Sequence, residues 1–216
     1  MSQPELNKVA WQWNLGIGFR NNDLSDLNKR LFTSNVSGFT GRYYGINFGA
    51  QAVFYERISL GFESNSFVNF GSPSAGINDF SLGGGNFGLL IGYNVLKKSN
   101  YRVSLNYGLG LDLSGLVITN NFNPTNFEDR INTKTTSTLS STNGFHRLSV
   151  RYDYLVRQEI RKTRKVSDAW GIEAGYYFAG DNNWLDNNAN EFEGPTIDNS
   201  GFFLRIVYSH LRNKLK

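Results

Sequence analysis

Apolar and polar residues alternate along most of this chain, and a period of two indicates β-strands that have one apolar face. In residues 11–19, tryptophan, leucine, isoleucine and phenylalanine alternate with glutamine, asparagine and glycine. The same alternation recurs in seven further segments, which are residues 44–54, 58–65, 86–95, 101–114, 147–157, 170–178 and 202–209. The pattern therefore predicts eight strands of roughly the 9–11 residues that a tilted strand needs to cross a bilayer.

The segments between the predicted strands are alternately short and long. The short ones are residues 56–57, 96–100 and the stretch around 161–167. The long ones are residues 20–42, 66–81, 118–144 and 181–200. Short periplasmic turns and long outer loops are typical of bacterial outer-membrane barrels, which also have an even number of strands. An even number brings both chain termini to the side of the short turns, so we expect both termini in the periplasm.

The first long loop contains one predicted helix, from Ser25 to Ser34. Serine is a preferred residue at a helix N-cap. Leu24, Leu27 and Leu31 share one face of this helix, because residues three or four positions apart lie on the same side.

The two faces of the predicted strands differ in the size of their side chains. One face carries tryptophan, leucine, isoleucine, phenylalanine and tyrosine, whereas the other is dominated by glycine, serine and asparagine with a few charged residues. In a soluble, lipocalin-like barrel the apolar face would line the interior. The interior of eight strands is only just wide enough for side chains, so these aromatic residues would overfill it. The large apolar face is therefore expected to look outward, and such a band needs lipid.

We therefore expect an all-β fold, an eight-stranded antiparallel up-and-down transmembrane β-barrel. It forms a single outer-membrane β-barrel domain over residues 1–216, with a short N-terminal lead at 1–8 and a tail at 211–216, because no linker or long repeat divides the chain. The mean hydropathy of −0.40 resembles that of a soluble protein. In a membrane barrel, however, lipid-facing and lumen-facing residues cancel in this average.

Cysteine and an export signal are both missing from the sequence. Without cysteine the chain has no disulfide framework. Residues 1–4 carry no apolar signal-peptide region. We therefore expect a mature or engineered form, in which Met1 replaces a removed export signal, that resides in a bacterial outer membrane.

Aromatic residues gather at both ends of the predicted strands, as expected for girdles at two membrane interfaces. Those near the short turns are Trp11, Trp13, Phe54, Tyr93, Tyr101, Tyr154, Trp170 and Tyr208. Those near the long loops are Phe19, Tyr44, Phe87, Phe178 and Phe202.

Several short segments resemble those of small outer-membrane β-barrel proteins of Bacteroidota-type bacteria. These segments are Leu27–Leu31, Tyr44–Gly49, Trp170–Tyr176, Gly180–Asp181 with Trp184, Gly194–Pro195 and Gly201–Arg205. Such families are mostly of unknown activity, so the resemblance implies a barrel and transfers no catalytic residue. One difference is that many outer-membrane barrels end on an aromatic residue that their assembly machinery reads, whereas this chain continues past Tyr208 to Lys216.

Eight charged residues fall on the predicted inner face. They are Glu63, Arg102, Asp112, Arg147, Arg151, Asp153, Glu173 and Arg205. Buried charges must be paired. The set therefore forms either a static network of ion pairs that fills the barrel or a gated polar path for ions, and the narrow interior of eight strands favours the static network.

Catalytic, metal and cofactor sites are not indicated. His146 and His210 are the only histidines, and they fall at opposite ends of the predicted barrel. The sequence has neither a G-x-S-x-G nor an H-E-x-x-H motif. A triad through His146 would need unseen partners from the loops, so we expect no enzymatic activity and no cofactor.

The fourth long loop combines acidic and aromatic residues. Its carboxylates are Asp181, Asp186, Glu191, Glu193 and Asp198. They could bind Ca²⁺, but their spacing does not match an EF-hand, and a solvated loop is favoured. Trp184 and Phe192 in the same loop either contact a partner or fold back on the rim of the barrel.

Basic residues gather at the predicted short-turn end, in a chain of net charge +4. They are Lys97, Lys98, Arg157, Arg161, Lys162, Arg164, Lys165, Arg212, Lys214 and Lys216. They could contact anionic headgroups or an acidic periplasmic protein, or they could simply be solvated. Nucleic acid is not expected as a partner of a membrane barrel.

The expected role is that of a membrane anchor or interaction scaffold that displays four surface loops, for example as an accessory subunit of a larger outer-membrane complex. The expected partners are outer-membrane lipid and other proteins of the outer membrane or periplasm. The alternative is a narrow channel or a barrel that transports small solutes, and an outer-membrane enzyme is less favoured.

Overall fold

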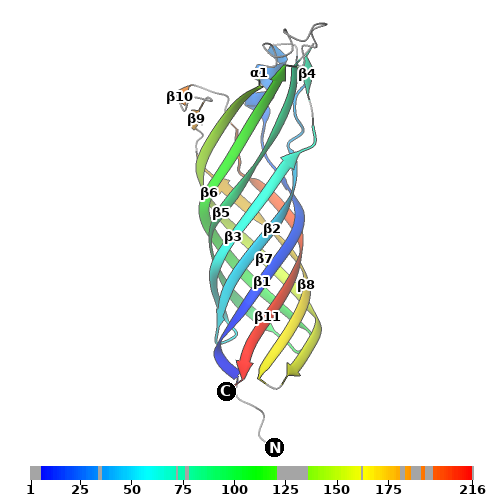
Figure 1. Ribbon diagram of the computed structural model, residues 1–216, viewed down its shortest axis with the longest axis vertical. Helices are drawn as coiled ribbons and strands as arrows, with labels where there is room; N and C mark the ends of the chain where they lie inside the picture. Colours follow the sequence, from blue (N-terminus) through cyan, green and yellow to red (C-terminus); the bar gives the residue numbers. More distant parts are fainter. Residues whose placement is uncertain are drawn as a thin grey trace, which may run out of the picture.

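The predicted eight-stranded antiparallel barrel is confirmed (Figure 1). The computed structural model describes residues 6–33, 36–71, 73–75, 78–120, 136–161, 163–180, 183–185, 191–192 and 197–215. Within these residues the barrel strands are β1 (Leu6–Asn21), β2 (Arg42–Phe54), β3 (Ile58–Asn69), β5 (Asn78–Lys97), β6 (Tyr101–Asn120), β7 (Thr136–Arg161), β8 (Arg164–Ala179) and β11 (Gly201–Leu215). Each strand pairs with the next one along the chain, and β11 pairs with β1 to close the ring.

The two ends of the barrel differ. We call one the short-turn end, because residues 55–57 and 98–100 join strands there, β1 begins there and β11 ends there (Figure 1). We call the opposite end the loop end. It carries α1 (Ser25–Thr33), β4 (Ser74–Ala75), β9 (Asn183–Leu185) and β10 (Glu191–Phe192).

The outer wall of the barrel is an apolar belt, as the difference in side-chain size predicted. The exposed fractions of Trp11, Leu105 and Ile172 are 60%, 49% and 56%. Gln12 beside Trp11 and Asn106 beside Leu105 are buried. The large apolar side chains therefore point outward, where only lipid can cover a belt of this kind.

Glycine on the inner face lets neighbouring strands approach closely. A Cβ atom on Gly18 would lie 2.3 Å from the carbonyl oxygen of Leu204 and 2.4 Å from the Cβ of Arg205. A larger residue there would push β11 away from β1, and Arg205 would move with it.

Several strands extend beyond their predicted ends. β7 begins at Thr136 rather than near residue 147, so part of the predicted third long loop is strand. At the short-turn end β1 begins at Leu6 and β11 runs to Leu215, where Lys214 pairs with Arg164. The predicted lead at 1–8 and tail at 211–216 are corrected accordingly. These extensions lie beyond the lipid-facing belt, so they do not need its apolar alternation. Backbone pairing with the neighbouring strands holds them together.

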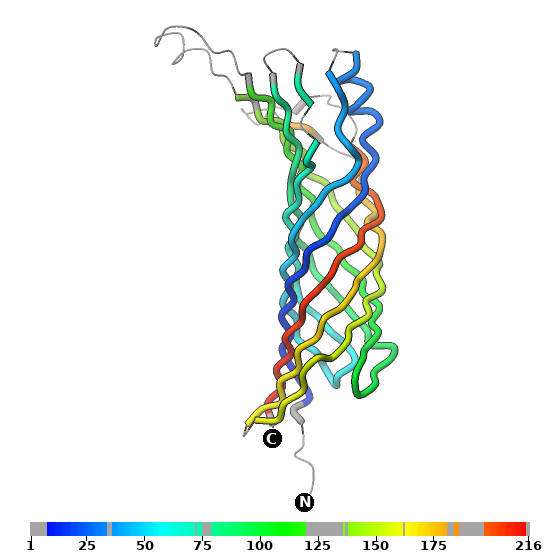
Figure 2. Tube along the Cα trace, turned by 90° about the vertical axis from the view of Figure 1, so that its right-hand side faces the viewer, coloured from blue at the N-terminus to red at the C-terminus, as the bar shows by residue number. Residues whose placement is uncertain are grey.

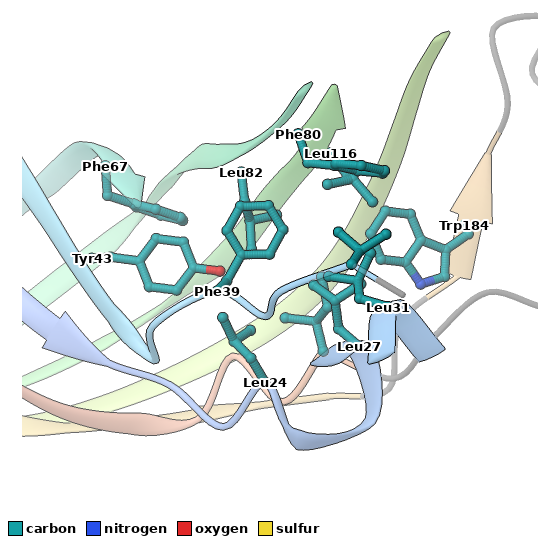
Figure 3. Packing of buried hydrophobic residues seen from close by; sticks show 12 residues of the cluster. Leu24, Leu27, Leu31, Phe39, Tyr43, Phe67, Phe80, Leu82, Leu116 and Trp184 are labelled. Atoms are coloured by element: carbon teal, nitrogen blue, oxygen red, sulfur yellow. The ribbon is translucent and has the colours of Figure 1, made fainter. Parts of the chain in front are cut away.

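A compact apolar core, which we call the mouth cluster, lies at the loop end (Figure 3). It consists of Leu24, Leu27, Leu31, Val36, Phe39, Tyr43, Phe67, Phe80, Leu82, Leu116, Trp184 and Ile197. The predicted helix is confirmed as α1, which contributes Leu27 and Leu31. The leucines of α1 pack in one cluster with side chains of β5, β6 and β9, so the described residues of this end form a cap on the barrel.

Candidate functional site

The lumen contains all eight charged residues that the sequence placed there, and they form three groups along the barrel. In the group nearest the short-turn end, Asp153 lies between two arginines. Its Oδ2 is 2.7 Å from Nη2 of Arg102, and its Oδ1 is 2.8 Å from Nε of Arg151. The Arg151 guanidinium also donates to Asn14 and Ser209. These bonds join β1, β6, β7 and β11 across the interior.

The middle group consists of two carboxylates and two arginines. Nη2 of Arg205 lies 2.6 Å from Oε2 of Glu63 and 2.7 Å from Oε2 of Glu173. Arg147 forms an ion pair with Glu63, and its Nη2 lies 3.7 Å from Oε1 of Glu173. All four side chains are buried. Each arginine therefore faces both carboxylates, and the group is neutral overall.

The group nearest the loop end includes Arg20, a residue of the predicted loop at 20–42. Nη1 of Arg20 lies 2.7 Å from Oδ2 of Asp112. The guanidinium carbon is 4.2 Å from the ring centroid of Phe67, 5.1 Å from that of Tyr177 and 5.9 Å from that of Tyr43. The even-numbered residues of β1 point inward, so continuing that alternation past Gly18 would have placed Arg20 in the lumen.

An aromatic layer separates the middle group from the Arg20 pair. Phe145, Tyr177 and Phe203 are buried and pack together. The guanidinium carbon of Arg147 is 5.5 Å from the centroid of Phe203, and that of Arg205 is 5.3 Å from it. Cation–π contacts of this length help to stabilise an arginine side chain that is buried away from water.

The described part of the lumen is packed. Its cavities have volumes of about 50 Å³ below the mouth cluster, about 10 Å³ in the middle and about 50 Å³ near the short-turn end. One water molecule needs roughly 10–15 Å³, so these cavities hold single waters or small groups of them.

The aromatic residues predicted to form a girdle lie on the outer wall. Trp11, Trp13, Tyr93 and Trp170 are exposed, whereas Phe54, Tyr101 and Tyr208 are half-buried. The rings of Trp170 and Tyr208 lie 5.4 Å apart between centroids.

The two histidines lie far apart, as expected. Nδ1 of His146 is 2.6 Å from the hydroxyl oxygen of Tyr107 on the outer wall. Nδ1 of His210 is 2.7 Å from Oδ1 of Asp168, near the short-turn end. No group of three or more metal-ligating side chains occurs among the residues that the structure describes. The same residues contain no helix that is long and apolar enough to cross a membrane.

The fourth loop is described only in part. Trp184 is 1% exposed and packs in the mouth cluster, so it folds back on the rim and does not present a surface to a partner. The backbone of Phe192 pairs with that of Trp184, but the side chain of Phe192 lies outside the described part of the chain. Asp181, Asp186 and Glu193, three residues of the predicted acidic set, also lie outside it.

Comparison with known proteins supports the fold. No protein-family model and no curated protein matches the chain. The major outer membrane protein of Thermus thermophilus superposes with a TM-score of 0.50 at 10% identity, over 96% of this chain and 100% of that one. Neisserial surface protein A superposes with a TM-score of 0.44 at 11% identity, over 96% of this chain and 97% of that one. The outer membrane protease OmpT of Escherichia coli superposes with a TM-score of 0.36 at 10% identity, over 99% of both chains. The likeness to the Thermus protein shows that this chain has an outer-membrane β-barrel fold.

Proposed function

We propose that this protein is a bacterial outer-membrane anchor that presents an ordered platform to partners at the cell surface. The loop end faces outward, and the short-turn end, with both termini, faces the periplasm. We further propose that it is a small barrel of the Bacteroidota type and that it serves as an accessory subunit in a larger outer-membrane complex.

The observation that carries the proposal is the closure of the lumen. Three groups of paired charges fill it, an aromatic layer divides it, and the mouth cluster covers its loop end. A channel needs a continuous hydrated path, whereas an anchor needs only a stable wall and a fixed surface. Catalysis is not part of the proposal, because the two histidines lie at opposite ends of the barrel.

Conductance across a planar bilayer tests the anchor against the channel. We expect no stable current steps from inserted protein, because its charges are paired and its cavities are small. Steps in the native protein that change in the Glu63→Gln variant would instead support a narrow ion path.

Orientation is checked by cysteine labelling in intact cells, since the chain has no native cysteine. Thr33→Cys in α1 and Ser99→Cys in the β5–β6 turn are both exposed positions. A membrane-impermeant maleimide should label Thr33→Cys on intact cells, and Ser99→Cys only after the envelope is permeabilised. The reverse pattern would contradict the proposed orientation.

A further inference from the structure

A basic surface adjoins the aromatic girdle at the short-turn end, on the outward side of β7, β8 and β11. We call it the basic face. It consists of the cations Arg157, Arg161, Arg164, Arg212 and Lys214, the carboxylates Glu159 and Asp168, and His210. Figure 2 shows the β7–β8 hairpin, in yellow, beside the red end of β11 at the lowest part of the barrel.

A series of contacts joins the basic face to the girdle. The ring of Tyr208 contacts that of Trp170, and its hydroxyl donates to Oδ1 of Asp168 over 2.9 Å. In the strand register Arg157 lies opposite Asp168, and Arg212 lies opposite Trp11. Aromatic girdles lie at the level of lipid headgroups. The basic face therefore begins in the headgroup layer and extends just beyond it.

The charge of the basic face is strongly positive. Five cations face two carboxylates, which leaves a net charge of +3 when His210 is neutral. A single carboxylate, that of Glu159, is shared by Arg157 and Arg161, whose side chains are 52% and 53% exposed. Arg212 and Lys214 are exposed as well. Guanidinium groups in such positions can bind phosphate oxygens in pairs.

An acidic peptide is the other partner to consider. Beyond Tyr154, which pairs with the first residue of β6, the outer edge of β7 has no neighbouring strand within the described residues. The turn at 98–100 covers the start of this edge, where Leu155 N donates to Asn100 O over 2.9 Å. Farther along, Arg157 and Arg161 occupy the edge, and charged residues oppose the addition of a strand. The edge of β7 is therefore a poor site for an added peptide strand, whereas the basic face lies where it can contact lipid headgroups.

We propose that the basic face binds the phosphate groups of anionic phospholipids in the leaflet at the short-turn end. This inference rests on the membrane insertion in the proposed function. It adds a preferred lipid class and a place where that lipid is held against the barrel wall.

Native mass spectrometry of detergent-solubilised protein, titrated with phosphatidylglycerol or phosphatidylcholine, tests the inference. We expect phosphatidylglycerol to bind at least about tenfold more tightly, since each juxtamembrane cation adds to the attraction. The triple variant Arg157→Gln, Arg212→Gln, Lys214→Gln should lose that preference. A matched control removes three exposed cations at the loop end, with Lys29→Gln, Arg30→Gln and Arg42→Gln, and should keep it.

A variant with the opposite effect makes the test independent of folding losses. Glu159→Gln removes the carboxylate that Arg157 and Arg161 share, and should strengthen phosphatidylglycerol binding by roughly twofold or more. Equal affinity of the native protein for the two lipids would overturn the inference, as would an equal loss in the loop-end control.

Two further measurements identify the source of any failure. All variants are first inserted into phosphatidylcholine vesicles and checked by tryptophan fluorescence. Failure of the native chain to insert counts against the proposed function, whereas insertion without a lipid preference contradicts this inference alone.

Oligoglutamate and inorganic phosphate are titrated in parallel. If oligoglutamate binds in a way that the triple variant abolishes, while phosphatidylglycerol shows no advantage, the face serves an acidic peptide. Inorganic phosphate bound as tightly as phosphatidylglycerol would show that the face binds free phosphate rather than lipid.

Discussion

The buried ion pair of Arg20 and Asp112 is a test of how the lumen is stabilised. Replacing Arg20 with Met leaves a buried carboxylate without its partner, and we expect a loss of about 3–5 kcal/mol in the free energy of unfolding. Replacing both residues, as in Arg20→Met with Asp112→Leu, removes the charges together and should restore most of that loss. Urea unfolding from lipid vesicles measures all three proteins. A double variant as unstable as the single one would show that the pair is not what Arg20 contributes.

The pKa of the Glu159 carboxylate should lie below its ordinary value. Hydrogen bonds from Arg161 and from Arg157 lower its pKa below the ordinary value of 4.5. Because the folded-state pKa is depressed, these bonds stabilise the folded protein above the unfolded-state pKa and are lost as the pH falls through the folded one. A ¹³C NMR titration of the side chain checks this, and Arg161→Gln should move the pKa back toward its ordinary value. A titration unchanged by that substitution would contradict the assignment.

At the scale of single residues, the sequence could identify which side chains enter the lumen but not how they pair. Alternation placed both glutamates on the inner face, because Glu63 follows the outward Phe62 and Glu173 lies between the outward Ile172 and Ala174. Their shared contact with Arg205 depends on the stagger of strands far apart in the chain, which the period of two does not contain. Arg20 was missed for a related reason, since no apolar residue follows it to show that the strand continues.

At the scale of elements, α1 should be held in place by the mouth cluster rather than by its own propensity. Short isolated helices are marginal in water, so packing must supply the stability. Leu27→Ala removes a buried side chain and should cost about 2–5 kcal/mol locally. Hydrogen exchange should show faster exchange of α1 amides, with those of the β1–β2 ladder unchanged. Equal acceleration in both regions would mean that the cap and the barrel unfold as one unit.

The extensions and the cap were the elements that the sequence revealed least. The apolar residues of the cap, such as Val36 and Phe39, lie in segments without a regular period, and such a pattern predicts a loop. Trp184 had two open interpretations, because an aromatic residue in a long loop gives no sign of what covers it. The burial of its side chain depends on α1 and β6, which are remote in sequence.

At the scale of the whole molecule, side-chain volume was the most informative property of the sequence. Alternation alone fits both a soluble barrel and a membrane barrel, since each has one apolar face. The difference between large residues on one face and glycine, serine and asparagine on the other decided which face points outward. The exposure of Leu105 and Ile172 confirms that decision.

The ring is closed by the pairing of the first strand with the last, with Leu6 opposite Leu215. Until β11 is available, β1 and β8 each keep an unsatisfied edge, and a bilayer core does not tolerate such edges. Insertion of this chain should therefore wait for β11, and a growing chain that has reached only β8 would have to be kept from both aggregation and premature entry into lipid.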